Sequence, residues 1–251
     1  MKSETGSCAE RMSEAPDWVD VTDEPNHKEI FRNEQIRVYV AAIPPGEETL
    51  YHRHDKDTLY LVLQGGKNTS CTFPGSKGTK YVFPKSVHLK RKVKWGLTRL
   101  LFGWTYLPKS TYFLMHNSGN PVIHKVRASE DNPGAMELMG IEFLGSSRCD
   151  PSISIDPHAL TPDYEDGSLC AFRVRLTSDL PRMGESLCFT GLVILLKGAL
   201  RIEASSREGS ACVPHDLKEG HFLWNDGSGR FAFAIPQSTE SEVLIIAMKS
   251  G

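Results

Sequence analysis

Short apolar runs separated by glycine and proline recur along the whole chain. The clearest are IRVYVAAI from residue 36, TLYLVLQ from residue 58, GLVILL from residue 191 and EVLIIAM from residue 242. Runs of this kind, rich in β-branched and aromatic residues and bounded by turn residues, are typical of strands. Helical periodicity is scarce, and its best candidate is the segment 89–102, between Pro84 and Pro108. The sequence therefore predicts a mainly β chain.

The two halves of the chain resemble each other weakly. Residues 36–66 and residues 172–199 both read as a strand, a Gly-Glu turn, a second strand and a glycine. With 251 residues the chain is long enough for two domains, each with its own core. We expect a solvated tail over 1–20, a first domain over 21–145, a linker rich in Ser, Pro, Asp and Gly over 146–167, and a second domain over 168–251.

The segment GEETLYHRH, from Gly46 to His54, carries the sharpest candidate site. Alternate residues of a strand point to one face, so His52 and His54 should project together with Arg53 opposite. Two imidazoles make half of a metal site, and a third ligand normally comes from a distant segment. His124 is our choice for it, with His116 as the second choice. We assign no chemical role to the remaining histidines, His27, His88, His158, His215 and His221.

This segment resembles the first motif of the cupin superfamily, G-x5-H-x-H-x3-E-x6-G. Gly46, His52, His54 and Gly65 fall in register with it, but Thr58 stands where the family has its glutamate and Asp57 lies one residue early. Which of the two, if either, supplies an oxygen ligand stays open. In the second motif His124 matches, while Ala128 stands where asparagine is usual. The resemblance implies an antiparallel jelly-roll barrel with a metal ion inside it.

The second half matches the same pattern without its histidines. Between the two glycines of each copy lie 18 residues in the first half and 13 in the second, and the missing residues correspond to HRHDK. The resemblance therefore implies a bicupin: two tandem cupin-type jelly-roll barrels, of which the second lacks metal ligands.

The function implied by the resemblance is a metal-dependent reaction on a small organic substrate. Three-histidine cupins resemble thiol dioxygenases, so our first hypothesis is an Fe(II)-dependent dioxygenase with His52, His54 and His124 as ligands; Ni, Mn and Zn are the alternative metals. A second hypothesis is a metal-dependent isomerase or lyase in which Tyr60, our candidate catalytic residue, moves a proton. A third is a non-catalytic binding or interaction protein.

Charge and motifs exclude several other classes of function. The 29 basic and 31 acidic residues leave a net charge of -2, so no overall field recruits nucleic acid or membrane. We interpret the basic segment Lys85 to Lys94 as a solvated insertion. No phosphate-binding loop and no G-x-S-x-G elbow occurs. Since the N-terminus has no apolar signal region, we expect a cytoplasmic protein whose partner is a small-molecule substrate; formation of a homodimer stays open.

Overall fold

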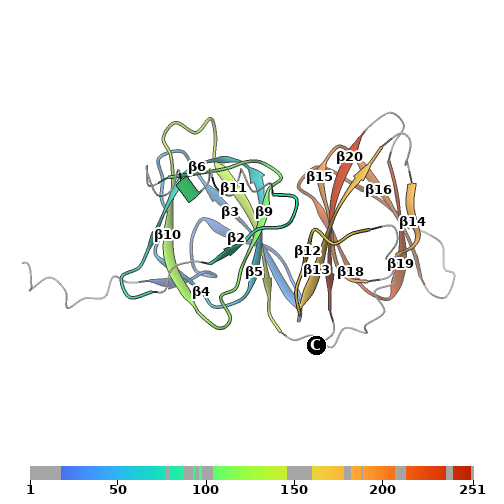
Figure 1. The fold of residues 1–251 in the computed structure, drawn as a ribbon, viewed down its shortest axis with the longest axis horizontal. Helices are drawn as coiled ribbons and strands as arrows, with labels where there is room; N and C mark the ends of the chain where they lie inside the picture. Colours follow the sequence, from blue (N-terminus) through green and yellow to red (C-terminus); the bar gives the residue numbers. More distant parts are fainter. Residues whose placement is uncertain are drawn as a thin grey trace, which may run out of the picture.

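In the computed structural model the described part of the chain consists mainly of strands, β1 to β20 (Figure 1). The structure describes residues 18–76, 80–87, 93, 96–97, 104–145, 160–177, 182–187, 189–206, 213–235 and 240–249. The prediction of a mainly β chain is confirmed. The expected helix over 89–102 lies outside the described residues, apart from positions 93, 96 and 97, and so does most of the basic segment after Val87.

Two sheets form the first barrel. The first sheet runs in the order β1 (Val19–Asp20), β4 (His52–His54), β10 (Val122–Ala128), β6 (Gly66–Thr72) and β8 (Thr105–Leu107). The second runs in the order β2 (His27–Arg32), β3 (Ile36–Ile43), β11 (Met136–Phe143), β5 (Thr58–Gln64), β9 (Tyr112–Met115) and β7 (Tyr81–Val82). Among the described strands only β1 and β4 pair in parallel. The other pairs, such as β4 with β10, are antiparallel, as is typical of a jelly roll.

Two further sheets form the second barrel. One has the order β12 (Tyr164–Glu165), β13 (Leu169–Leu176), β20 (Ser241–Met248), β15 (Thr190–Lys197) and β18 (Phe222–Asp226). The other has the order β14 (Arg182–Leu187), β19 (Gly229–Ala234), β16 (Leu200–Ser206) and β17 (Val213–Leu217). The domain boundaries stay predictions, and β1 reaches into the expected tail while β12 lies within the expected linker.

The repeat seen in the sequence corresponds to equivalent strands of the two barrels. In the first barrel β3 and β5 both pair with β11, and in the second barrel β13 and β15 both pair with β20. The apolar runs are nearly continuous because these strands are buried on both faces. On β3, for example, Val38 packs between the barrels, whereas Tyr39 and Ala41 point into the first barrel.

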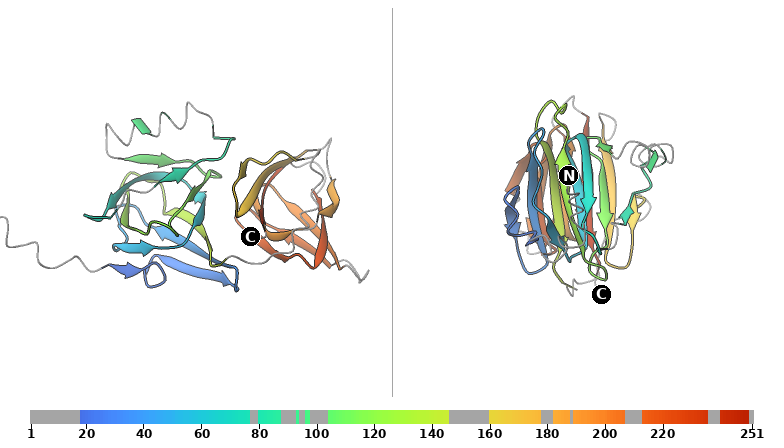
Figure 2. Two further views of the ribbon diagram at one scale, coloured as in Figure 1. Left: turned by 60° about the horizontal axis from the view of Figure 1, so that its bottom comes forward. Right: turned by 90° about the vertical axis from the view of Figure 1, so that its left-hand side faces the viewer.

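The barrels stand side by side and share one hydrophobic core (Figures 1 and 2). Ile36, Leu59 and Ile141 of the first barrel pack in the same cluster as Leu192 and Ile246 of the second. The interior of the second barrel holds a separate cluster that is apolar throughout its described members, Phe172, Leu195 and Phe233 among them. That the second barrel lacks metal ligands stays a prediction.

A search of the described residues finds no helix with the length and apolar character needed to span a membrane.

Candidate metal centre

The two histidines of β4 project into the first barrel. His52 and His54 are buried, with 1% and 0% of their surface exposed, because they occupy alternate positions of the strand. Arg53 between them faces the other way, and its guanidinium lies 5.5 Å from the centre of the Trp18 ring. The expected orientation of all three side chains is therefore present in the structure.

His124 lies directly beside this pair on the neighbouring strand. In the antiparallel ladder of β4 and β10, His124 is opposite His52, so both side chains point to the same face. The ring of His124 lies 4.8 Å from that of His52 and 5.0 Å from that of His54, between centroids. The structure thus brings together the three residues proposed from the sequence as ligands.

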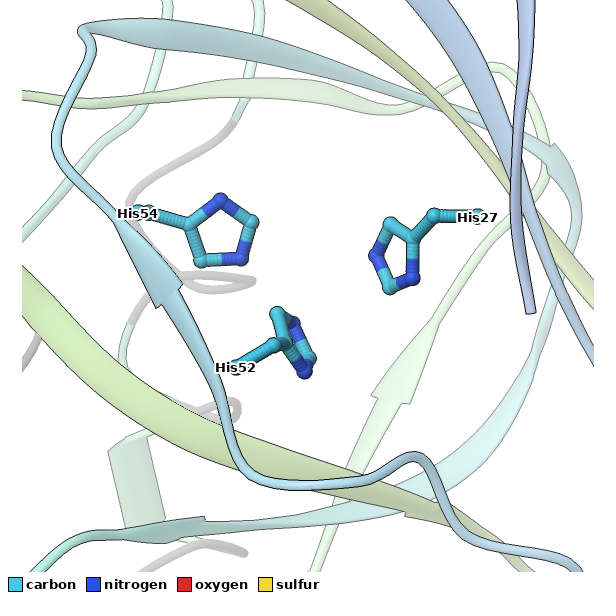
Figure 3. Close-up of side chains that lie close together, drawn as sticks. All are labelled: His27, His52 and His54. Carbon is cyan, nitrogen blue, oxygen red and sulfur yellow. The ribbon is translucent and has the colours of Figure 1, made fainter. Parts of the chain in front are cut away.

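His27 also belongs to this group, which the sequence interpretation missed. It is the first residue of β2, and its ring centroid lies 4.7 Å from that of His52. Figure 3 shows His27, His52 and His54 arranged around a common space. The spacing of residues in the sequence does not point to His27, because His27 comes from a strand of the opposite sheet.

Hydrogen bonds hold the rings in place. Nδ1 of His52 donates to the carbonyl oxygen of Leu50 at 2.9 Å, and Nδ1 of His27 is bonded to the carboxylate of Glu24. Ser70 Oγ lies 3.3 Å from Nδ1 of His124. A ring whose Nδ1–H is donated in this way presents Nε2 as the atom for a metal, and such outer contacts fix the orientation of metal-binding histidines.

Glu24 is itself held firmly. Only 1% of its surface is exposed, and its carboxylate accepts hydrogen bonds from the backbone N–H of Asn26 at 2.8 Å and of Leu50 at 3.2 Å. Burial acts to raise the pKa of Glu24, but the hydrogen bond and charge of His27 outweigh it, so the pKa is lowered. Glu24 is therefore an anion placed to accept the Nδ1–H of His27.

His52 and His54 are kept in the form that binds metals. Burial lowers the pKa of His52 to about 4. Burial, together with the neighbouring His124, lowers the pKa of His54 well below its usual value. Both rings are neutral near pH 7, and a neutral imidazole is the ligand form.

The geometry fits one divalent transition metal. The ligand atoms of His27, His52 and His54 all lie within 4.8 Å of one another. With metal–nitrogen bonds of about 2.1 Å, two ligand atoms on one ion lie no more than about 4.2 Å apart. The nitrogens would thus lie slightly closer together around a bound ion than they do here, and imidazoles suit Fe, Ni, Cu and Zn.

The residues in line with the glutamate of the family motif play other parts. Asp57 accepts a hydrogen bond from the backbone N–H of Ser118 at 2.8 Å and pairs with His116 at 3.2 Å. Thr58 Oγ1 donates to the carbonyl oxygen of Lys56 at 2.9 Å. His116, the second choice for the third ligand, pairs with Asp57 and lies next to the Tyr164 hydroxyl. Asp57 and His116 therefore contact each other and not the histidine cluster.

A carboxylate does lie near the cluster, on the strand next to Thr58. Glu142 of β11 is directly opposite Thr58 in the sheet and is 2% exposed. One oxygen pairs with Arg37 at 2.6 Å, and the other, without a hydrogen-bond partner, lies 3.8 Å from Nδ1 of His54. Burial raises the pKa of Glu142 to about 7, against the lowering effect of Arg37.

Tyr60 lies beside the cluster as well. Its hydroxyl accepts a hydrogen bond from Tyr39 at 2.9 Å and lies 3.2 Å from Nδ1 of His54. Burial raises the pKa of Tyr60, so the phenol keeps its proton. Gly140 leaves room for the Tyr39 ring, since a Cβ there would lie 2.2 Å from Tyr39 Cζ.

The histidines line a cavity of about 70 Å³ inside the barrel. All four border it, together with Tyr60. Most of the remaining described lining is apolar and comes from both sheets, including Ile43, Phe113, Met115, Met136 and Leu138. A metal bound here would thus face a small, largely apolar chamber.

No protein-family model and no curated protein matches the sequence. Solved structures do match. AerE from Microcystis aeruginosa aligns at 13% identity and a TM-score of 0.50, over 90% of this chain and 98% of that one. A structure of oxalate decarboxylase aligns at 10% identity and a TM-score of 0.53, over 92% and 76%. Another, on the Mn(II) centres of the Bacillus subtilis oxalate decarboxylase, has 10% identity, a TM-score of 0.51 and coverage of 92% and 77%. The two-barrel cupin fold expected from the sequence is confirmed.

Proposed function

We propose, starting from the two-barrel cupin fold, that this chain is an enzyme whose first barrel binds one divalent transition metal and acts on a small organic substrate. The observation that carries the proposal is the cluster of histidines that lines a cavity, in which His52 and His54 are buried and their pKa values are lowered. His52, His54 and His124 are the ligands proposed from the motif, and His27 is added as a fourth.

Fe(II) is our first choice of metal and oxidation with O2 our first choice of reaction. A divalent ion held by imidazoles supplies Lewis acidity and, where it is iron, redox chemistry with oxygen. The chain's own contribution is to orient the ligand rings through Leu50 and Glu24, and to exclude bulk water with the apolar wall around Phe113.

A metal-dependent isomerase or lyase is the second candidate. The observation that favours it is the buried hydroxyl of Tyr60, which keeps its proton and lies next to His54. A phenol in this position can give a proton to a substrate atom or take one back. Activity in the absence of oxygen would separate this candidate from the dioxygenase.

Metal analysis of the purified protein tests the shared part of these proposals. We expect about one equivalent of metal in the wild type, and none in the variant His52→Ala/His54→Ala, which removes two ligands. His221→Ala is the matched control, because His221 is an exposed residue of the second barrel. Metal retained by the double variant would contradict the ligand assignment, and a wild type that takes up no metal would favour a non-catalytic binding protein.

A further inference from the structure

The cavity is lined by the histidines and by a set of mainly apolar side chains. His52, His54 and His124 border it together with Phe113, Met115 and Leu138. An apolar wall favours an apolar ligand surface, at roughly 25 cal/mol for each Å² removed from water. The part of a ligand that lies beyond the metal should therefore be hydrocarbon.

Three hydroxyls within this wall are bonded to protein partners. Thr105 Oγ1 donates to Asn68 Oδ1 at 3.0 Å. Thr49 Oγ1 accepts the backbone N–H of Val126 at 2.9 Å, and the Tyr60 hydroxyl accepts a hydrogen bond from Tyr39. Each hydroxyl keeps some hydrogen-bonding capacity but carries no charge, so these groups compensate little for the desolvation of a second charged group on the ligand.

Charge points in the same direction. The described residues that line the cavity include no lysine, arginine, aspartate or glutamate. The buried cation Arg37 is not in the lining. Its guanidinium is paired with Glu142 and lies 5.5 Å from the centre of the Tyr39 ring. A carboxylate at the far end of a ligand would thus be desolvated against apolar side chains, at a cost of several kcal/mol.

The size of the cavity sets a limit on the ligand. Its volume of about 70 Å³ is less than half of the roughly 150 Å³ that accommodates benzene in an engineered protein cavity. The apolar part of the ligand is therefore short, on the order of three or four carbon atoms.

We propose, resting on the metal site of the proposed function, that the cavity takes a short-chain molecule with a single metal-binding head of at most one negative charge and an uncharged hydrocarbon body. The head lies on the metal among the histidines, and the body lies against Phe113, Met115 and Leu138. A ligand with a second charged group at its far end is rejected.

Butyrate and succinate test this inference as a matched pair, because they have the same chain length and differ in the second carboxylate. The protein is loaded with Co(II), whose visible absorption changes when a ligand joins the metal, and each acid is titrated in turn. We expect butyrate to change the spectrum and to bind at least about tenfold more tightly than succinate.

The possible outcomes separate this inference from the function on which it rests. Succinate binding as tightly as butyrate, or binding by either acid without a change in the cobalt spectrum, overturns the inference and leaves the metal site intact. Failure to take up cobalt overturns the metal site and the inference together.

Variants of matched size locate the hydrocarbon body. Leu138→Ala enlarges the cavity, so it should raise the affinity for hexanoate relative to butyrate by about tenfold. Leu195→Ala makes the same truncation in the core of the second barrel and should leave this ratio unchanged. An equal ratio in both variants would overturn the placement of the body beside Leu138.

Discussion

At the scale of single residues, the site depends on side chains that hold the histidines as much as on the histidines themselves. His52 is held by the carbonyl of Leu50, two positions earlier in the chain, whereas His27 is held by Glu24, an acid three positions earlier. Carboxylates that accept the second ring proton of a ligand histidine raise the basicity of the ligand.

Glu24→Gln should weaken metal binding about 10- to 100-fold while the protein stays folded, because the amide removes the negative charge behind His27. The affinity is measured by competition with a fluorescent chelator. Glu29→Gln on β2, the strand that begins with His27, is the control, since Glu29 is exposed and pairs with Arg32 at 3.5 Å. Equal affinities for all three proteins would show that Glu24 has no part in the site.

Gly140→Ala should lower the free energy of unfolding by about 1–3 kcal/mol, because the new methyl group overlaps the Tyr39 ring. Displacing that ring also breaks the bond to Tyr60. Urea denaturation gives the measurement. Gly134→Ala is the control, since a Cβ there meets nothing within 4 Å. If the two variants lose the same stability, the close approach at Gly140 carries no cost.

Part of this residue-level description could be predicted from the sequence. His52 and His54 follow from strand alternation, and His124 follows from a family motif that places a third ligand on a paired strand. His27 and Glu142 could not be found in this way, because their proximity to the cluster depends on how two sheets close around one space. The spacing of residues along the chain does not show how the two sheets pack together.

At the scale of elements, three adjacent strands carry a row of buried polar residues near the histidines. On β3, β11 and β5 the residues Arg37, Glu142 and Thr58 are direct neighbours across the sheet. The family motif places a glutamate on the strand that here contributes Thr58, and the acid of this chain lies one strand away. The apolar runs of the sequence predicted β3 and β5 but not β11, and the order in which strands pair is a property of the whole sheet.

The buried pair of Arg37 and Glu142 allows a test of this layer. Arg37→Met alone should destabilise the protein by about 3–5 kcal/mol, because it leaves a buried carboxylate without its cation. The double variant Arg37→Met/Glu142→Leu should recover most of that loss, since both charges are then absent. Denaturant unfolding measures both variants. A double variant that is less stable than the single one would contradict the proposed pairing.

At the scale of the whole molecule, the barrels are joined by a hydrophobic core and by polar contacts at its edge. Asp163 of the segment leading into the second barrel accepts hydrogen bonds from Tyr112 at 2.7 Å and from the Ser86 hydroxyl at 2.7 Å. Phe31 packs on Trp224 with ring centroids 6.1 Å apart. The sequence predicted two barrels, but not that they bury a common face. Both faces of these strands are apolar, so the pattern does not show which face points into the barrel and which packs against the other barrel.

The two barrels should therefore unfold together. Separating them would expose Leu59 and Ile141 on one side and Ile246 on the other, all of which are buried in the shared cluster. We expect calorimetry to show one transition whose van't Hoff and calorimetric enthalpies agree. Two resolved transitions would mean that the interface contributes little to the stability of either barrel.

X-ray absorption spectroscopy of the protein loaded with one equivalent of metal tests whether the four histidines bind the ion. We expect a coordination shell with four imidazole nitrogens, and three in the variant His27→Ala, since His27, His52, His54 and His124 lie around one space. An unchanged number of imidazoles in His27→Ala, or a shell made mainly of oxygen or sulfur ligands, would contradict this expectation.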